Sequence, residues 1–130
     1  MSIDLIQAPG TKAPRGHYSQ AIVANGIVFL AGLVPVDLET GEPKVGTIEE
    51  QTERVLRNAE RILEAAGSSL SHLVQVTVFL TRIEDWDRMN RTYAQILGDH
   101  RPTRTVVPVA PLHFGAGIEI QCVAVVAGSR

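Results

Sequence analysis

The sequence is short of cysteine, of net charge and of long apolar runs. Among its 130 residues Cys122 is the one cysteine, so no internal disulfide forms, and no Cys or His spacing fits a structural zinc site. With 12 Lys and Arg against 14 Asp and Glu, the formal charge of −2 gives no general attraction to nucleic acid. This cysteine usage fits a reducing compartment, and we expect a cytoplasmic protein.

No segment has the length and composition of a membrane span or an export signal. The longest apolar run, residues 123–127, is far shorter than the about 20 residues that cross a bilayer. Residues 1–10 carry Asp4 and Pro9 and lack the basic start and apolar stretch of a signal peptide. Hydrophobic residues make up 45% and charged residues 20%, with no repeat or linker, so we predict one globular domain over residues 1–130.

An amphipathic helix is predicted over residues 48–66, where apolar side chains recur three and four positions apart. Thr47 and Glu50 form a capping-box pattern at its start, and Gly67 stands where a left-handed residue would end it.

A second helix is predicted from about Glu84 to Leu97. Trp86, Asn90 and Tyr93 fall on one stripe of it, and Gly98 follows as its stop.

Five segments have strand patterns, and together with the two helices they give the order β-β-α-β-α-β-β. They are Tyr18–Ala24, Ile27–Val34, Leu73–Leu80, Thr105–Val109 and Ile118–Val126. Asn25 and Gly26 favour a tight hairpin between the first two, because a type I′ turn needs positive φ at both central residues. In the third segment, alternation places Val74, Val76 and Val78 on one face. The irregular connections, residues 36–47 and 110–117, suit the border of a site.

Two helices can cover only one face of such a sheet, although several of the strands are apolar on both faces. We therefore expect the second face to pack against further copies of the chain in a closed ring.

Two charged residues in strand segments are candidates for catalysis. Glu119 lies in an otherwise apolar run, where a carboxylate is either a base that orients water or a structural residue that faces solvent or pairs across a subunit boundary. Arg104 follows Pro102 at the entrance of a strand, where a guanidinium fork suits a carboxylate, although an ordinary surface role fits as well. Asn90 and Tyr18 complete the polar candidates, and each fits a structural role when taken alone.

Metal and nucleotide motifs are absent from the sequence. The four histidines, His17, His72, His100 and His113, lack metal-ligand spacing, so we predict no metal. Residues 115–117 precede a strand and lack the Lys of a phosphate loop, and we predict no cofactor. Cys122 shares its strand face with apolar neighbours, which is typical of a core thiol.

Eight blocks of the sequence occur in the order in which a known family has them. They are Gly16–Ala21, Val28–Pro35, Glu50–Thr52, Ala65–Leu70, Val76–Leu80, Asn90–Tyr93, Arg101–Arg104 and Ile118–Ile120. The chain thereby resembles, along nearly its whole length, the RidA/YjgF reactive-intermediate (enamine/imine) deaminases, also labelled endoribonuclease L-PSP. The resemblance implies a chorismate-mutase-like α+β domain, with a mixed sheet and two helices on one face, that forms a homotrimer with clefts between subunits.

The resemblance also gives the four polar candidates their roles. Arg104 corresponds to the arginine that binds the substrate carboxylate, Glu119 to the strand glutamate, Tyr18 to the pocket tyrosine and Asn90 to the helix asparagine.

Four positions depart from the family pattern. Ala31 stands in place of a serine, Leu33 of a glutamine, Val106 of a cysteine and His17 of a proline. With Ala31 and Val106 counted among its substrate-binding residues, the expected pocket is more apolar or differently shaped, as in a neighbouring subfamily.

The implied activity is hydrolysis of a small 2-imino or 2-enamino acid to a 2-oxo acid and ammonia. Arg104 would hold the carboxylate, and Glu119 would orient water or carry protons. The alternatives are deamination of a larger enamine such as an aminomuconate, and a non-catalytic module that binds small carboxylates. Ribonuclease activity ranks last, because Arg54, Arg57 and Arg61 are not accompanied by an aromatic RNA-binding face.

Overall fold

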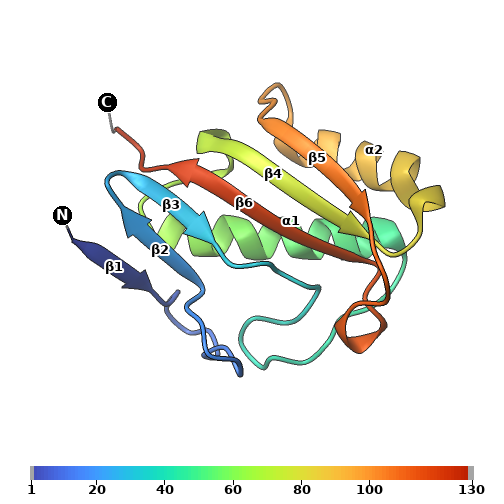
Figure 1. Cartoon of the computed structure of the whole chain (residues 1–130), viewed down its shortest axis with the longest axis horizontal. Coiled ribbons are helices and arrows are strands. Elements are labelled where there is room, and N and C mark those ends of the chain that lie inside the picture. Colours follow the sequence, from blue (N-terminus) through green and yellow to red (C-terminus); the bar gives the residue numbers. More distant parts are fainter. Residues whose placement is uncertain (1, 129–130) are drawn as a thin grey trace.

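The computed structural model describes residues 2–128 as one six-stranded sheet with two long helices (Figure 1). In chain order the elements are β1 (Ile3–Ile6), β2 (Ala21–Ala24), β3 (Ile27–Leu30), α1 (Ile48–Ala65), η1 (Leu70–His72), β4 (Leu73–Leu80), η2 (Ile83–Asp85), α2 (Trp86–Leu97), β5 (Thr103–Pro108), η3 (His113–Gly115) and β6 (Ile118–Val125). The strand order is β1-β2-β3-β6-β4-β5, and only β4 and β5 run parallel. The predicted α+β class is confirmed.

The helix boundaries follow the local chemistry of the sequence. Thr47 Oγ1 accepts from the Glu50 amide at 3.1 Å, and Glu50 Oε1 accepts from the Thr47 amide at 2.8 Å, which completes the predicted capping box. Gly67 follows α1 with a φ of +80°. Helix α2 starts at Trp86, later than predicted, because residues 83–85 form the separate short helix η2.

Both helices lie behind the sheet in Figure 1, which confirms the prediction that they share one face. The core between the two layers consists of side chains that are fully buried. From the sheet it includes Val28, Val76, Val78, Leu80, Ile118 and Ile120, and from the helices Val55, Leu56, Ile62, Leu63 and Met89. Each such side chain stabilises the fold by about 1.5–3 kcal/mol relative to exposure.

Three strand predictions are wrong in their limits. Strand β2 starts at Ala21, so Tyr18 lies in an irregular loop, and β3 ends at Leu30, after which Leu33 makes an isolated bridge with Ile120. Strand β5 starts two positions earlier than predicted, at Thr103, and includes Pro108 as its last residue. A proline is tolerated there because β5 is an edge strand.

The sequence patterns also missed one strand and misplaced one side chain. Strand β1 is a four-residue edge strand beside β2. Its Ile3 and Leu5 are exposed and only Ile6 packs against the core, so its inward apolar face is too short to recognise. In β4 the pairing register shifts between Leu73 and Gln75, and Val74 is therefore 43% exposed instead of buried with Val76.

The other face of the sheet is left open by this chain. Strand alternation and register place on it Ile3, Leu5, Ile22, Phe29, Phe79, Val107 and Val123. Phe29 is 46% exposed. Within residues 2–128, no helix is both long and apolar enough to cross a membrane.

Candidate active site

Arg104 points from β5 toward α2, on the helix-covered side of the sheet. Its Nη1 donates to Asn90 Oδ1 at 2.8 Å. Its Cζ lies 4.7 Å from the ring centre of Tyr93 and 5.3 Å from that of Trp86. Because Trp86, Asn90 and Tyr93 are spaced by four and three positions, they share one face of α2. Two rings and one amide thus orient the guanidinium, and each cation–π contact contributes about 0.5–1 kcal/mol.

The Arg104 guanidinium is half-buried and forms no ion pair with any carboxylate of residues 2–128. The hydrogen bond to Asn90 uses only one of the N–H groups of the fork. Neutral groups therefore fix the direction of a cation whose charge is not neutralised by any of these residues. Such a group is suited to bind an anion that comes from outside.

Tyr93 provides the ring beneath Arg104, and its hydroxyl is buried without a hydrogen-bond partner among the described residues. Burial raises the pKa of the Tyr93 phenol to about 12, although the nearby Arg104 charge acts in the opposite direction. The phenol is therefore neutral at physiological pH, and its ring is the part that contacts the cation.

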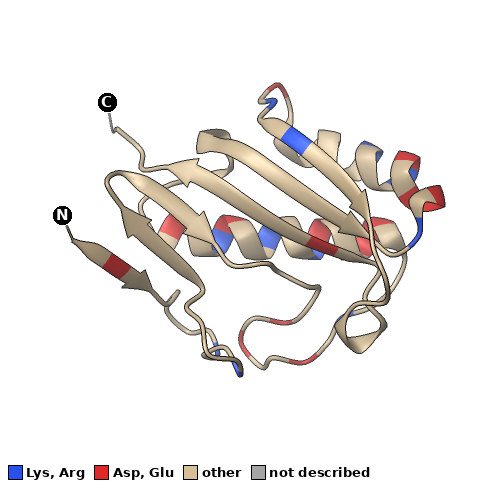
Figure 2. Ribbon diagram, in the orientation of Figure 1, with Lys and Arg blue, Asp and Glu red and all other residues tan. Residues whose placement is uncertain are grey.

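Glu119 leaves the sheet on the opposite, open side. Its neighbours Ile118 and Ile120 are buried toward the helices, so alternation directs Glu119 away from them. The carboxylate lies over Gly32, where an added Cβ would overlap Oε2. The glycine thus leaves the space that the carboxylate occupies. The charge view shows an acidic position on β6, whose one acidic residue is Glu119, and a basic position on β5, whose one basic residue is Arg104 (Figure 2).

The register of the sheet shows that Arg104 and Glu119 do not meet within one chain. Arg104 pairs with Val76, which is buried toward the helices, whereas Glu119 pairs with Phe79 on the open face. The two side chains are therefore separated both by the sheet and by three residues along β4.

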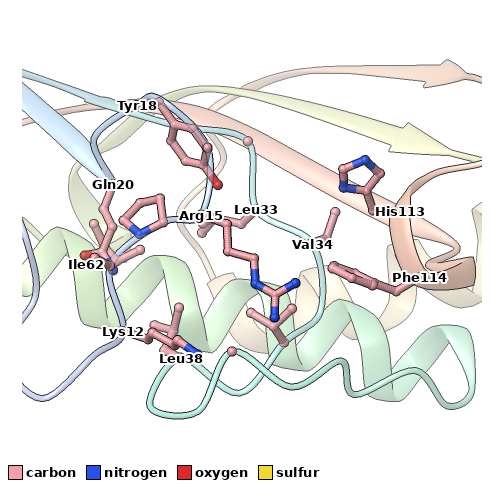
Figure 3. Close-up of a pocket in the computed structure, with 16 residues that line it drawn as sticks. Lys12, Arg15, Tyr18, Gln20, Leu33, Val34, Leu38, Ile62, His113 and Phe114 are labelled. Atoms are coloured by element: carbon pink, nitrogen blue, oxygen red, sulfur yellow. The ribbon is translucent and has the colours of Figure 1, made fainter.

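Tyr18 lies with Gly32 at a cavity of about 490 Å³, shown in Figure 3. The Tyr18 side chain is 58% exposed and sits in the loop before β2. The amide of Ala31 donates to the carbonyl of Gln20 at 3.0 Å, which holds the two loops together. Tyr18, Ala31 and Glu119 are thus grouped around Gly32.

The predicted residues accordingly fall into two groups in one chain. Asn90 joins Arg104 directly, and Val106 lies two positions along β5 on the same side of the strand. Tyr18, Ala31 and Glu119 form the second group. The sequence patterns did not predict this separation.

The sequence reasoning missed two supporting residues, Trp86 and Tyr93, which it identified only as members of one helix stripe. Their shared stripe with Asn90 was visible, but their contact with Arg104 depends on how α2 packs on β5. His113 lines the cavity, and His17 does not. Cys122 is buried, and burial raises the pKa of its thiol to about 12, which confirms the prediction of an unreactive core cysteine.

The arginines considered for RNA binding are largely engaged by acidic residues. Arg57 pairs with Glu60 at 3.1 Å and Arg61 with Glu39 at 3.4 Å. No group of three metal-binding side chains occurs among residues 2–128.

Known proteins share both the sequence and the fold. The family model for Endoribonuclease L-PSP matches residues 7–126. A RutC family protein of Pyrococcus abyssi is 41% identical over 95% of this chain and 98% of its own length. Reactive Intermediate Deaminase A of Arabidopsis thaliana is 38% identical over 93% of this chain and 65% of its own length.

Solved structures agree with these relatives. A Thermotoga maritima protein described as an endoribonuclease is 46% identical, with a TM-score of 0.89 over 96% of this chain and 98% of its own. Escherichia coli TdcF with bound serine is 32% identical, with a TM-score of 0.86 over 94% and 98% of the two chains. The fold and the site define a small α+β protein in which an arginine beside the sheet edge is held by Asn90, Tyr93 and Trp86. The chain belongs to the endoribonuclease L-PSP family. The solved structures that resemble it include Rid and YjgF proteins.

Substitutions of Tyr93 test the support of Arg104. Tyr93→Phe removes the unpartnered hydroxyl and keeps the ring, so we expect the free energy of unfolding to rise by up to about 1 kcal/mol. Tyr93→Leu also removes the ring and should lower it by about 2 kcal/mol. Urea unfolding followed by circular dichroism measures both changes. A Tyr93→Phe protein as unstable as Tyr93→Leu would show that the hydroxyl, and not the ring, supports the site.

The ionisation of Tyr93 provides a second test. The chain has two tyrosines, so Tyr18→Phe leaves Tyr93 as the one phenol. We expect its ultraviolet absorption to change near pH 12 in the folded protein, against about pH 10 for an unfolded chain. Because the folded-state pKa is the higher one, the stability contribution is complete below pH 10 and is lost between about pH 10 and 12. A folded-state transition at pH 10 would contradict the burial of the phenol.

Proposed function

We propose that the protein hydrolyses small 2-imino or 2-enamino acids to 2-oxo acids and ammonia. The observation that carries this proposal is the guanidinium of Arg104, which is fixed by Asn90 and two aromatic rings and has no acidic partner in the described chain. Such a fork suits the carboxylate next to the reacting carbon of an imino acid. The relative named Reactive Intermediate Deaminase A supports the same chemistry.

In the proposed reaction, Arg104 binds the substrate carboxylate and withdraws electron density from the adjacent C=N bond. Water attacks the carbon of that bond while Glu119 accepts a proton from the water. Glu119 returns this proton to the nitrogen, and the hydroxyl of the resulting carbinolamine gives up its proton to the leaving nitrogen as the C–N bond breaks and the C=O bond forms. One imine and one water thus yield one 2-oxo acid and one ammonia, and Glu119 ends in its starting state.

A single chain keeps Arg104 and Glu119 apart, so the proposed reaction requires a second copy of the chain. Arg104 and Glu119 face opposite sides of the same sheet, so the anchor of one copy would meet the glutamate of another. The open face is apolar, with Phe29 and Val123 paired side by side on β3 and β6, and it is suited to pack against other copies. We propose a homotrimer with its reaction sites between subunits.

A larger enamine, such as an aminomuconate, is the second candidate substrate. The observation that favours it is the half-buried, apolar Val106 on the same side of β5 as Arg104.

A carboxylate-binding role without turnover needs only the Arg104 anchor. A measurement of imine hydrolysis separates this role from catalysis.

Hydrolysis is tested with 2-iminopropionate that an amino-acid oxidase generates in the assay. Semicarbazide traps the remaining imine as its semicarbazone, so a slower formation of semicarbazone than without the protein measures the protein's activity. We expect Arg104→Ala and Glu119→Gln each to lower kcat/KM by about 10-fold to 100-fold, as the loss of a charged hydrogen bond predicts. Arg101→Ala is the matched control, since Arg101 is exposed in the preceding loop. If both site variants match the wild type, the mechanism is wrong.

Substitution on the open sheet face tests the assembly. We expect the wild-type chain to sediment at three times its monomer mass. Phe29→Glu places a charge at the centre of the apolar face and should produce monomers with little imine hydrolysis. Val45→Glu is the control, because Val45 is equally exposed, at 45% against 46%, but lies in the 36–47 loop. Wild-type mass and activity in Phe29→Glu would exclude this face as the interface.

A further inference from the structure

We infer that Gln51 is a positioning residue for Glu119, through the hydrogen bond that its side-chain amide accepts from the backbone of Gly117. The inference rests on the proposed function, in which Glu119 accepts a proton from the attacking water. Gln51 lies near the start of α1 and is only 5% exposed. It therefore acts through the backbone that carries Glu119 and does not touch the substrate.

The Gln51 amide joins the two irregular connections, residues 36–47 and 110–117, which both line the cavity shown in Figure 3. Its Nε2 donates to the Gly46 carbonyl at 2.8 Å, and its Oε1 accepts from the Gly117 amide at 2.8 Å. Because a backbone carbonyl only accepts and a backbone N–H only donates, the two ends of the side-chain amide cannot be exchanged. An ionised glutamate would offer acceptors alone, and a methionine would offer no donor and only a weak acceptor.

The Gly117 bond lies two residues before Glu119 and fixes the entry of β6. The Gly117 carbonyl also accepts from the Thr81 amide at 3.1 Å, just after β4. On the other side of Glu119, Ile120 exchanges two backbone hydrogen bonds with Leu33, at 2.8 and 3.0 Å. Glu119 thus stands between two fixed points, and the Gln51 bond ties the first of them to α1.

The start of β6 also packs closely on the start of α1. A Cβ added at Gly117 would be in van der Waals contact with Ile48 Cδ1 at 3.4 Å and with Gln51 Oε1 at 3.6 Å. Ile48 is buried like Gln51. In so closely packed a region, a change in the length or charge of the Gln51 side chain shifts the neighbouring backbone, and with it the carboxylate of Glu119.

Asn58 is the matched comparison for Gln51. It is a buried amide of the same helix, 7% exposed, and its Nδ2 donates to the Val36 carbonyl at 2.7 Å. Asn58 therefore ties α1 to the same 36–47 connection, but within residues 2–128 it makes no hydrogen bond to β6. Loss of this amide should lower stability and leave Glu119 in place.

The imine assay on full-length Gln51→Met and Asn58→Leu tests the inference. Both substitutions remove buried hydrogen bonds, so both should lower the midpoint of urea unfolding. We expect Gln51→Met to lower kcat by about 10-fold to 100-fold, because a small displacement of a group that transfers protons has an effect of this size. Its KM should stay within about 3-fold of the wild type, since the Arg104 anchor is unchanged. Asn58→Leu should keep the kcat of the wild type.

Gln51→Glu provides a rescue that depends on pH. The ionised carboxyl accepts from Gly117 but repels the Gly46 carbonyl, whereas the protonated carboxyl donates to Gly46 and accepts from Gly117 as the amide does. Burial favours the protonated form, so the kcat of Gln51→Glu relative to the wild type should rise about 3-fold or more between about pH 8 and 6. The relative kcat of Gln51→Met should not change over this range, because methionine does not titrate.

The position of Glu119 is also measurable without turnover. The resonance of its side-chain carboxyl carbon, assigned with Glu119→Gln, should move in Gln51→Met by more than a linewidth and stay in place in Asn58→Leu. If the wild type does not hydrolyse the imine, the proposed function fails, and this resonance alone decides whether Gln51 positions Glu119. Wild-type kcat in Gln51→Met, an equal loss of kcat in Asn58→Leu, or an unmoved Glu119 resonance would each overturn the inference.

Discussion

The pairing of β4 with β6 is the constraint on which the rest of the structure depends. Val76 opposite Cys122 and Val78 opposite Ile120 place four buried side chains beneath the helices. Because side chains alternate along a strand, a slip of β6 by one residue would turn Ile120 and Cys122 to the open face and bury Glu119. At about 1.5–3 kcal/mol for each large apolar side chain, this register is strongly preferred. The parallel pairing of β5 with β4 then extends the same register to the sheet edge.

Because the sheet is covered by helices on one face and open on the other, the groups of the proposed reaction are divided between subunits. The anchor, Arg104, is supported by α2 and belongs to the covered side, whereas Glu119 belongs to the open side that would form the trimer interface. Residues that hold copies together and residues that move protons then share one surface. An apolar substitution on the open face can leave the single chain folded and still alter the proposed catalysis. It would do so by changing how Glu119 approaches Arg104 of the adjacent copy.

Features set by near neighbours in sequence were predictable, and features set by distant contacts were not. The capping pair Thr47 and Glu50 lies within one helical turn, so its sequence pattern was sufficient. Val74 was misplaced because the bulge depends on pairing between β4 and β6. The bond from Arg104 to Asn90 likewise depends on packing of α2 against β5, which no local pattern encodes. The resemblance assigned the candidate site residues by position, but it did not show that one chain keeps them apart.

The side chains at the proposed site favour attack by water over covalent catalysis. Ala31 and Val106 carry no reactive atom, and Cys122 is buried with its thiol pKa raised to about 12, far from a thiolate at neutral pH. What the site offers is a fixed cation and a carboxylate. Addition of water to a C=N bond needs charge stabilisation and proton transfer but no enzyme nucleophile, so an imine matches this set of groups. Cleavage of RNA would require phosphate contacts, and two of the three arginines considered for them, Arg57 and Arg61, form exposed ion pairs with Glu60 and Glu39 that a phosphate would have to displace. The fixed cation and the carboxylate are therefore the groups on which the proposed imine hydrolysis rests.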